Sequence, residues 1–329
     1  MRSTTILAMS ASLLSGCASK SGQADLSVTR LPDARPRNVV FILSDDHRYD
    51  YMGFLNTLPW LQTPNMDFLA ANGAYVRNAF VTTSLSSPSR ASILTSLFSH
   101  EHTVVDNVAP VPEGLTFFPQ YLQEAGYTTG FFGKWHMGDT DDSPQPGFDH
   151  WESFEGQGSY YNVKMNVNGK EVVYPEDAYV TDLLTDHAIE FIEKNREKPF
   201  FVYLSHKAVH DPFAASETYD GIYDDERIPK PANFDEPTYG LHAVPSKGAD
   251  NQPAKGSEWY GEKRLPDWVK EQRESWHGVD YSYFGRTDWE TEAKRYCQCL
   301  TSMDASIGRI LDYPVSYTHL RAHETRRHL

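Results

Sequence analysis

The sequence predicts an α/β fold built on a mostly parallel central sheet, and three features of the chain support this prediction. Apolar runs alternate with segments of helical periodicity along most of its length. The run over residues 38–44 is continuously apolar, which is typical of a strand buried on both faces. Further runs over 128–132 and 199–204 each follow a predicted helix. Parallel strands joined by crossover helices explain this order.

Helical segments are expected at five places. They begin after Thr63 and at Ser86–Pro88, and they cover residues 117–125, 178–195 and 288–312. An extended segment over 75–83 is expected to lead into the turn at Ser86, and a hairpin is expected around Asn168-Gly169 within the polar stretch 141–175. Residues 211–287 lack periodicity and are predicted to form a long surface insertion.

The N-terminal segment resembles a lipoprotein signal peptide. Met1-Arg2 is followed by a short apolar run, and Leu14-Ser15-Gly16-Cys17 is similar to the lipobox of bacterial lipoproteins. We therefore expect residues 1–17 to direct export, a lipid on Cys17 to anchor the protein to the membrane, and residues 18–36 to form a linker. The expected location is the bacterial cell envelope, in the periplasm or at the cell surface.

Composition narrows the possible classes of protein. The chain has 329 residues with 40% hydrophobic residues, which is enough for a sizeable core. A net charge of −15 argues against nucleic acid as a partner. Cys297 and Cys299 lie too close together for good disulfide geometry and are read as packing residues. Residues 314–329 break the helical pattern and are interpreted as a non-native tail, which leaves 37–313 as the catalytic domain.

Polar residues with catalytic potential follow several predicted elements. They are Asp45 and Asp46 after the first strand, Ser86 and Arg90 at the turn, Lys134 and His136 after the next strand, and His206 and His210 after the last. Open α/β sheets bind their ligands at the carboxyl ends of parallel strands, so these groups are expected to converge. Paired carboxylates suit Ca²⁺ or Mg²⁺, and clustered cations around a hydroxyl suit sulfate or phosphate.

The segment Ser86-x-Pro88-Ser89-Arg90-x-x-x-Leu94-Thr95 resembles the signature of type I sulfatases in its serine form. Supporting similarities extend over residues 38 to 312: Asp45-Asp46, Thr63-Pro64-Asn65-Met66-Asp67, Asn78-Ala79-Phe80, Gly133-Lys134-Trp135-His136-Met137-Gly138, and Ser205-His206-Lys207-Ala208-Val209-His210. This resemblance implies an alkaline-phosphatase-like α/β/α sandwich.

The resemblance also implies a modified residue and a metal. Ser86 would be oxidised to formylglycine (3-oxoalanine) by a radical-SAM sulfatase-maturing enzyme. An aldehyde hydrate suits sulfate transfer because one hydroxyl attacks and the other later expels sulfate, whereas a serine would remain as a stable ester. Asp45 and Asp46 would bind Ca²⁺, preferred here over Mg²⁺, and the ion would also contact residue 86.

By the same resemblance, the cationic groups would handle the sulfate. Arg90 would stabilise the hydrate, Lys134 and His210 would bind the sulfate, and one of these two would protonate the leaving oxygen. His136 would receive the proton of formylglycine. His206 is left open between a supporting position and a substrate contact.

Part of the expected family site has no counterpart in the sequence. The family supplies an Asp-Asn metal pair and a further lysine after a later strand. Neither Asp250-Asn251, in the insertion, nor Asp106-Asn107, which comes too early, is a credible substitute. We therefore expect the C-terminal subdomain to be missing and the truncated chain to be inactive.

The function expected from these features is removal of O-sulfate from a carbohydrate of glycosaminoglycan or mucin type, such as N-acetylglucosamine 6-sulfate. Two alternatives remain open at this point. One is a phosphoesterase of the same fold that uses unmodified Ser86. The other is a non-catalytic surface lipoprotein that binds sulfated glycans.

Overall fold

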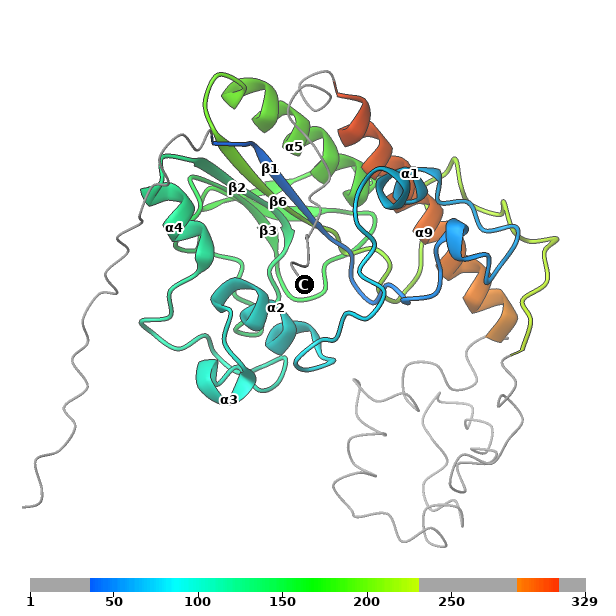
Figure 1. Ribbon diagram of the computed structural model, residues 1–329, viewed down its shortest axis with the longest axis horizontal. Helices are drawn as coiled ribbons and strands as arrows, with labels where there is room; N and C mark the ends of the chain where they lie inside the picture. Colours follow the sequence, from blue (N-terminus) through cyan, green and yellow to red (C-terminus); the bar gives the residue numbers. More distant parts are fainter. Residues whose placement is uncertain (1–35, 231–288, 314–329) are drawn as a thin grey trace, which may run out of the picture.

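A computed structural model describes residues 36–230 and 289–313, in which a central sheet lies between two layers of helices (Figure 1). Within these residues the sheet has six strands in the order β1-β6-β2-β3-β4-β5. The strands are β1 (Val39–Leu43), β2 (Thr128–Lys134), β3 (His150–Phe154), β4 (Lys164–Val167), β5 (Lys170–Val173) and β6 (Phe200–Ser205). The pairs β1–β6, β6–β2 and β2–β3 are parallel, and the β4–β5 hairpin continues the sheet in antiparallel fashion.

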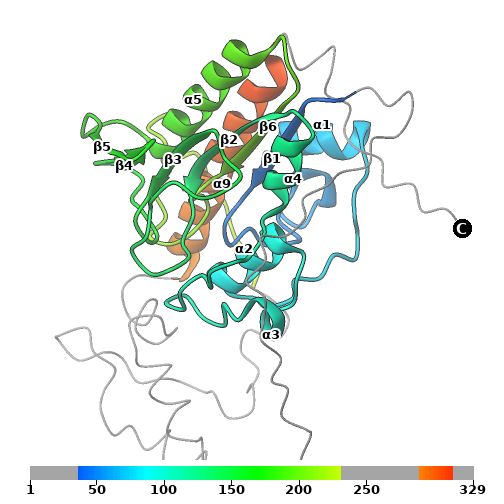
Figure 2. The ribbon, with the colours of Figure 1, turned by 90° about the vertical axis from the view of Figure 1, so that its left-hand side faces the viewer.

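The helices cover both faces of this sheet. They are η1 (Gly53–Leu55), α1 (Pro64–Asn72), α2 (Ser86–Thr95), α3 (Ser99–His102), α4 (Phe118–Glu124), α5 (Val180–Asn195) and α9 (Trp289–Asp312). Helix α5 packs on β2 and β6, α9 packs on α5, and α1 packs on α9 (Figure 2). Helices α2 and α4 lie on the opposite face. None of the described helices is both long enough and apolar enough to cross a membrane.

Two hydrophobic cores, one on each face, explain why β6 is apolar at every position from Phe200 to Leu204. Phe132 and Leu204 belong to the core under α5 and α9, whereas their neighbours Phe131 and Tyr203 belong to the core under α2 and α4. Successive side chains of a strand point to opposite faces, so a strand covered on both sides is apolar at most of its positions. The predicted α/β class and the three predicted strands are confirmed.

Two elements differ from the prediction. Residues 75–83 form no strand in the structure; their apolar side chains face solvent, and Phe80 is 92% exposed. Ser86 is therefore reached through an irregular loop rather than from a strand of the sheet. Conversely, β3 lies inside the polar stretch 141–175 and was not predicted, although the hairpin at Asn168-Gly169 was. Most of the predicted insertion 211–287 lies outside the described residues.

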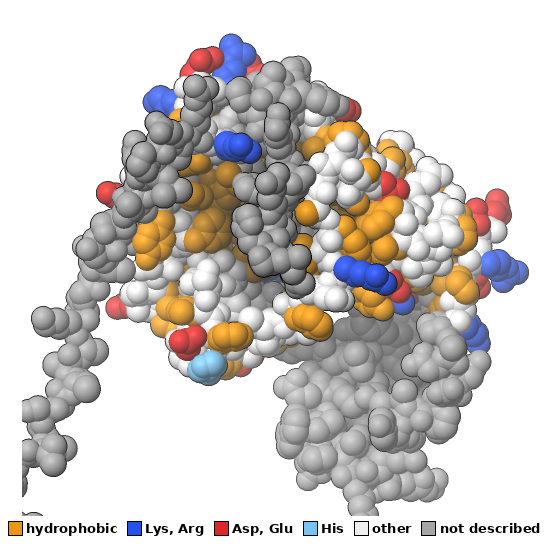
Figure 3. Space-filling model, in the orientation of Figure 1, with side chains coloured by type: hydrophobic (Ala, Val, Ile, Leu, Met, Phe, Trp, Pro, Cys, Tyr) orange, Lys and Arg blue, Asp and Glu red, His pale blue; other side chains and the backbone are white. Residues whose placement is uncertain are grey.

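Large hydrophobic side chains remain exposed around α3 and the loop before α2. Figure 3 shows such side chains dispersed among polar ones on this face of the molecule. Val76, Phe80, Val81, Phe98, Val105 and Val108 are all more than half exposed.

The predicted helices at 117–125, 178–195 and 288–312 are confirmed. Cys297 and Cys299 are free and fully buried, as expected for packing residues.

Candidate active site

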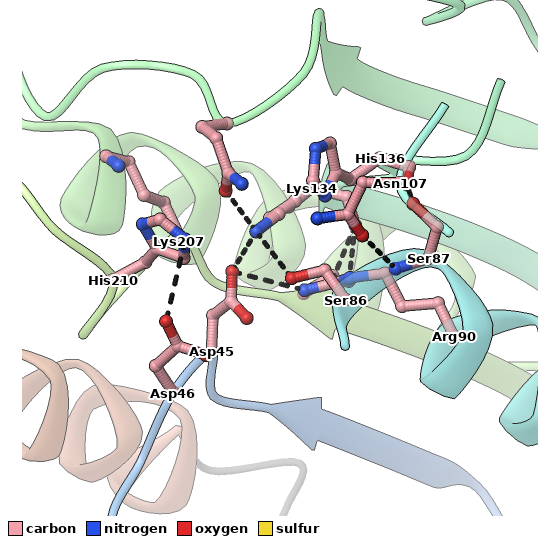
Figure 4. Close-up of polar contacts among 12 residues, drawn as sticks. Asp45, Asp46, Ser86, Ser87, Arg90, Asn107, Lys134, His136, Lys207 and His210 are labelled. Atoms are coloured by element: carbon pink, nitrogen blue, oxygen red, sulfur yellow. Dashed lines mark hydrogen bonds and ion pairs between the residues drawn. The ribbon is translucent and has the colours of Figure 1, made fainter. Parts of the chain in front are cut away.

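The polar residues predicted from the sequence meet at the carboxyl end of the parallel strands (Figure 4). Asp45 follows β1, Lys134 ends β2, and His210 follows β6. Ser86 is the first residue of α2, and Arg90 lies one turn further along the same helix. The convergence follows from the parallel strand order, which brings the ends of β1, β6 and β2 side by side.

Helix α2 is held at its first turn by contacts from two distant loops. The Ser87 N–H donates to Asn107 Oδ1 at 3.0 Å, and the Ser87 hydroxyl donates to the backbone carbonyl of His136. The helix lacks a capping side chain at Leu85, so Asn107 satisfies one of the N–H groups left unpaired at its N-terminus. These contacts fix Ser86 at the helix N-terminus, where the helix dipole favours an anion.

Arg90 ties this helix to the two central strands. Its Nη1 donates to the Lys134 carbonyl at 2.7 Å and to Ser205 Oγ at 2.6 Å, and Ser205 Oγ also donates to the Lys134 carbonyl at 2.8 Å. Its Nη2 lies 3.6 Å from Asp45 Oδ2. Arg90 is only 3% exposed, and these acceptors and the carboxylate stabilise its guanidinium in the interior.

Asp45 and Lys134 form a buried ion pair in the middle of the site. Burial alone would raise the pKa of Asp45, but the nearby cations, Lys134 foremost, lower it to about 2. Burial is also the largest influence on Lys134, and it lowers the pKa of this ammonium to about 8 even though Asp45 opposes the shift. Both groups are therefore charged near neutral pH, and Lys134 is a stronger acid than an ordinary lysine.

The histidines occupy three different environments. His210 Nε2 lies 3.5 Å from Asp46 Oδ2, and the Tyr160 hydroxyl donates to the His210 carbonyl at 2.9 Å. Burial, with Lys134 and Arg90, lowers the pKa of His136 to about 3, so its ring is neutral, and its buried Nδ1 has no partner among the described residues. His206 is fully buried, and burial lowers its pKa to about 4.

Oxygen ligands for a hard cation are present but few. Asp45 is ionised and Asp46 is adjacent to it, but the described part of the chain contains no group of three His, Cys, Asp or Glu residues able to hold a metal. Asp106 does not contribute, because its carboxylate accepts the N–H groups of Val108 and Ala109 in its own loop. Asp250-Asn251 lies outside the described residues.

Three residues in the site were not predicted as part of it: Asn107, Gln157 and Ser205. Asn107, which is not expected to bind a metal, lies against the first turn of α2. Gln157 Oε1 accepts a hydrogen bond from Lys134 Nζ. Gln157 lies in the loop after β3, so recognising that strand would have drawn attention to the Gly156-Gln157-Gly158 turn that follows it.

Comparisons with known proteins show which family and which relatives this chain resembles. The family model described as Sulfatase matches residues 37–314. The chain is 31% identical over 345 residues to N-acetylglucosamine-6-O-sulfatase of Bacteroides thetaiotaomicron, covering 94% of this chain and 59% of that protein. It is 30% identical over 240 residues to N-acetylglucosamine-6-sulfatase of Capra hircus, covering 67% and 41%.

A solved structure of a protein in complex with its substrate, D-glucosamine-2-N,6-O-disulfate, is similar in fold. The TM-score is 0.67 at 28% sequence identity, and the match covers 88% of this chain and 64% of that one. The chain thus spans less than two thirds of the length of these relatives.

Proposed function

This chain belongs to the sulfatase family, and we propose on that premise that it serves to hydrolyse sulfate esters of carbohydrates, with 6-sulfated glucosamine as the substrate class. One observation carries the proposal: Ser86 lies at a helix N-terminus within 3.4 Å of Lys134 Nζ, beside the buried Arg90 and Asp45. The names of the similar proteins, which act on 6-sulfated N-acetylglucosamine, support the substrate class.

The charge and protonation state of each residue in the site indicate the role that it would have. Lys134 and His210 would bind the oxygens of the sulfate, with the Arg90 charge beside them. Lys134, with a pKa of about 8, would donate a proton to the leaving sugar oxygen. His136 is neutral, and its buried Nδ1 has no partner within residues 36–230 and 289–313, so it would accept a proton released at residue 86.

A divalent cation fits part of this site. Asp45 and Asp46 offer carboxylate oxygens, which suit Ca²⁺, and residue 86 would add a contact from the helix. No group of three His, Cys, Asp or Glu ligands lies among the described residues, whereas Ca²⁺ prefers about six to eight oxygens. Bound Ca²⁺ would neutralise charge on the sulfate oxygens. Formylglycine made from Ser86 would supply a nucleophile that can be regenerated, which an unmodified serine cannot.

Two further proposals rest on the amino-acid sequence alone. We infer that a radical-SAM maturing enzyme is a partner, because the residue at position 86 is serine rather than cysteine. We also infer that Cys17 is lipidated and anchors the exported protein to the bacterial cell envelope.

Mass spectrometry of the Ser86 peptide tests the mechanism. The chain is produced with and without a serine-type radical-SAM maturase, and modification would lower the peptide mass by about two hydrogens. A Ser86→Ala variant is the control. An unmodified peptide in the presence of an active maturase would contradict the formylglycine mechanism.

Substrate assays separate the remaining alternatives. Sulfate release from N-acetylglucosamine 6-sulfate, compared with galactose and choline sulfates, is measured on the chain and on a version extended to the length of the Bacteroides thetaiotaomicron relative. Phosphate release by unmodified Ser86 would indicate a phosphoesterase. Binding of the sulfated sugar without any turnover, even after modification, would indicate a glycan-binding protein.

A further inference from the structure

Within the part of the chain that the structure describes, three oxygen acceptors surround the Lys134 ammonium. It donates to Asp45 Oδ2 and to Gln157 Oε1, and it lies 3.4 Å from Ser86 Oγ. An ammonium carries three N–H groups, so each acceptor accounts for one of them. Two short contacts thus hold the lysine head while its third N–H is directed at the residue proposed to react.

The orientation of the Gln157 amide follows from chemistry. An ammonium can only donate hydrogen bonds, so the oxygen of the amide, and not its nitrogen, must face Lys134. The Gln157 side chain is therefore bound by a charge-assisted hydrogen bond to a group that is itself fully buried.

The fold brings Gln157 to this place through strand pairing. Strands β2 and β3 are parallel neighbours, and Lys134 pairs with Phe154 at their ends. The chain then turns back through Gly156 and Gly158, which have φ values of +53° and +62°. A Cβ on Gly158 would overlap the Phe154 ring, so the turn packs tightly against the strand that it follows.

The charge of the acceptor matters as much as its position. With Asp45 alone, the ammonium would be drawn toward that carboxylate and away from Ser86. A neutral amide oxygen on another side opposes this displacement without adding a second negative charge. The positive charge of Lys134 therefore remains available for an anionic substrate.

We propose that Gln157 is a positioning residue that holds the Lys134 ammonium between Asp45 and Ser86, so that it can bind the sulfate of the substrate. The role of this positioning in sulfate binding rests on the proposed sulfatase function. The placement of Lys134 does not depend on that function and can be tested separately.

The placement is tested by NMR of the chain labelled with [ζ-15N]lysine, in which the Lys134 signal is identified by its loss in Lys134→Arg. Gln157→Ala is expected to shift this signal or to broaden it by exchange with water, whereas Gln157→Glu, which retains an acceptor oxygen, should preserve a narrow signal. Gln123→Ala removes a distant amide that binds Asp149 and is the matched control. An unchanged Lys134 signal in Gln157→Ala would overturn the proposal.

The role of Gln157 in sulfate binding is tested by a double-mutant cycle. The affinity for glucosamine 6-sulfate is measured by titration calorimetry with Ca²⁺ present. Gln157→Ala should weaken binding about tenfold in the wild-type chain and have little effect in a Lys134→Ala background. Gln157→Glu should also weaken binding, because it adds a negative charge. An equal loss in both backgrounds would overturn the claim that Gln157 acts through Lys134.

The two measurements distinguish the possible failures. If the wild-type chain binds no sulfated sugar while Gln157→Ala still moves the Lys134 signal, the proposed function fails and the positioning of Lys134 stands. If the sugar binds equally well to the wild type and to Gln157→Ala, the positioning proposal fails and the proposed function stands. Circular dichroism of each variant verifies that the chain is folded.

Discussion

Replacement of Gly133 by alanine should force apart the two strands that carry the site. Gly133 lies on β2, directly before Lys134, and pairs with Ser205 of β6. Its φ is +116°, and a Cβ at this position would overlap the Ser205 carbonyl oxygen, far inside the 3.0 Å limit of real Cβ contacts. The obstacle is backbone rather than a mobile side chain, so rotation cannot relieve it. Leu184 Cδ1 would also be crowded, at 3.1 Å.

Two costs contribute to the expected loss of stability. The left-handed φ costs a residue with a side chain about 1–2 kcal/mol. The overlap in a well-packed interior adds about 1–3 kcal/mol, because the strands must shift. The sum, about 2–5 kcal/mol, is a large fraction of the roughly 5–15 kcal/mol by which a typical domain is stable.

Gly169→Ala is the matched control for this experiment. Gly169 has a φ of +85°, but a Cβ there would meet no atom within 4 Å, so only the conformational cost of about 1–2 kcal/mol remains. Unfolding in urea can be followed by the fluorescence of Trp135 and Trp151, both of which are buried. The midpoint should fall for both variants and fall further for Gly133→Ala.

The outcome that refutes this reasoning is equal destabilisation of the two variants. It would mean that β2 and β6 can separate at this point without cost. Because Ser205 Oγ and the Lys134 carbonyl both bind Arg90, such freedom would also contradict the rigid placement of Arg90 described above.

Three further predictions concern stability and metal binding. Asp304→Ala should cost about 1–3 kcal/mol in urea unfolding, because the N–H groups of Asn65 and Met66 at the start of α1 lose their acceptor; a loss below about 0.5 kcal/mol would contradict this role. The hydrogen bond to Glu152 raises the pKa of His187 above 6.5, so its contribution to stability is fully present below pH 6.5 and is lost as pH rises through the higher folded-state pKa. Urea midpoints across this pH range should therefore decline less in His187→Gln than in the wild type, and parallel declines would refute the assignment. Ca²⁺ should raise the thermal unfolding midpoint of the wild type but not of Asp45→Asn, and an equal rise in both would exclude Asp45 as a ligand.

The sequence predicts the central sheet well because β2 and β6 are buried along almost their whole length, and β1 is recognised by its apolar run Val39–Leu43, although its residues are only partly buried. Strand β3 escapes prediction because it contains His150, Glu152 and Ser153. Glu152 is tolerated in the interior because His150 and His187 each bind one of its oxygens, and His187 comes from a distant helix that no local pattern reveals. Residues 75–83 mislead in the opposite way, since their apolar side chains are exposed.

The same reasoning applies to the candidate site. Residues that close a predicted strand or form a motif, such as Asp45, Lys134 and Ser86, could be predicted to meet. Asn107 and Gln157 could not, because each reaches the site by a side-chain contact from a loop whose course depends on tertiary packing. Prediction from sequence therefore found the charged groups and missed the two neutral amides, of which Asn107 binds the start of α2 and Gln157 binds Lys134.

The strand order has a consequence for how the protein folds during synthesis. In the described chain β1 is an edge strand whose only neighbour is β6. Val39 can therefore pair in the sheet only after Phe201 has been synthesised. Asp45 is then fixed by backbone hydrogen bonds to Ala208 and Val209, which leave the ribosome later still. Contacts between residues so far apart in the chain form slowly, because a long loop must close first. The acidic end of β1 is thus synthesised well before the residues that fix its position.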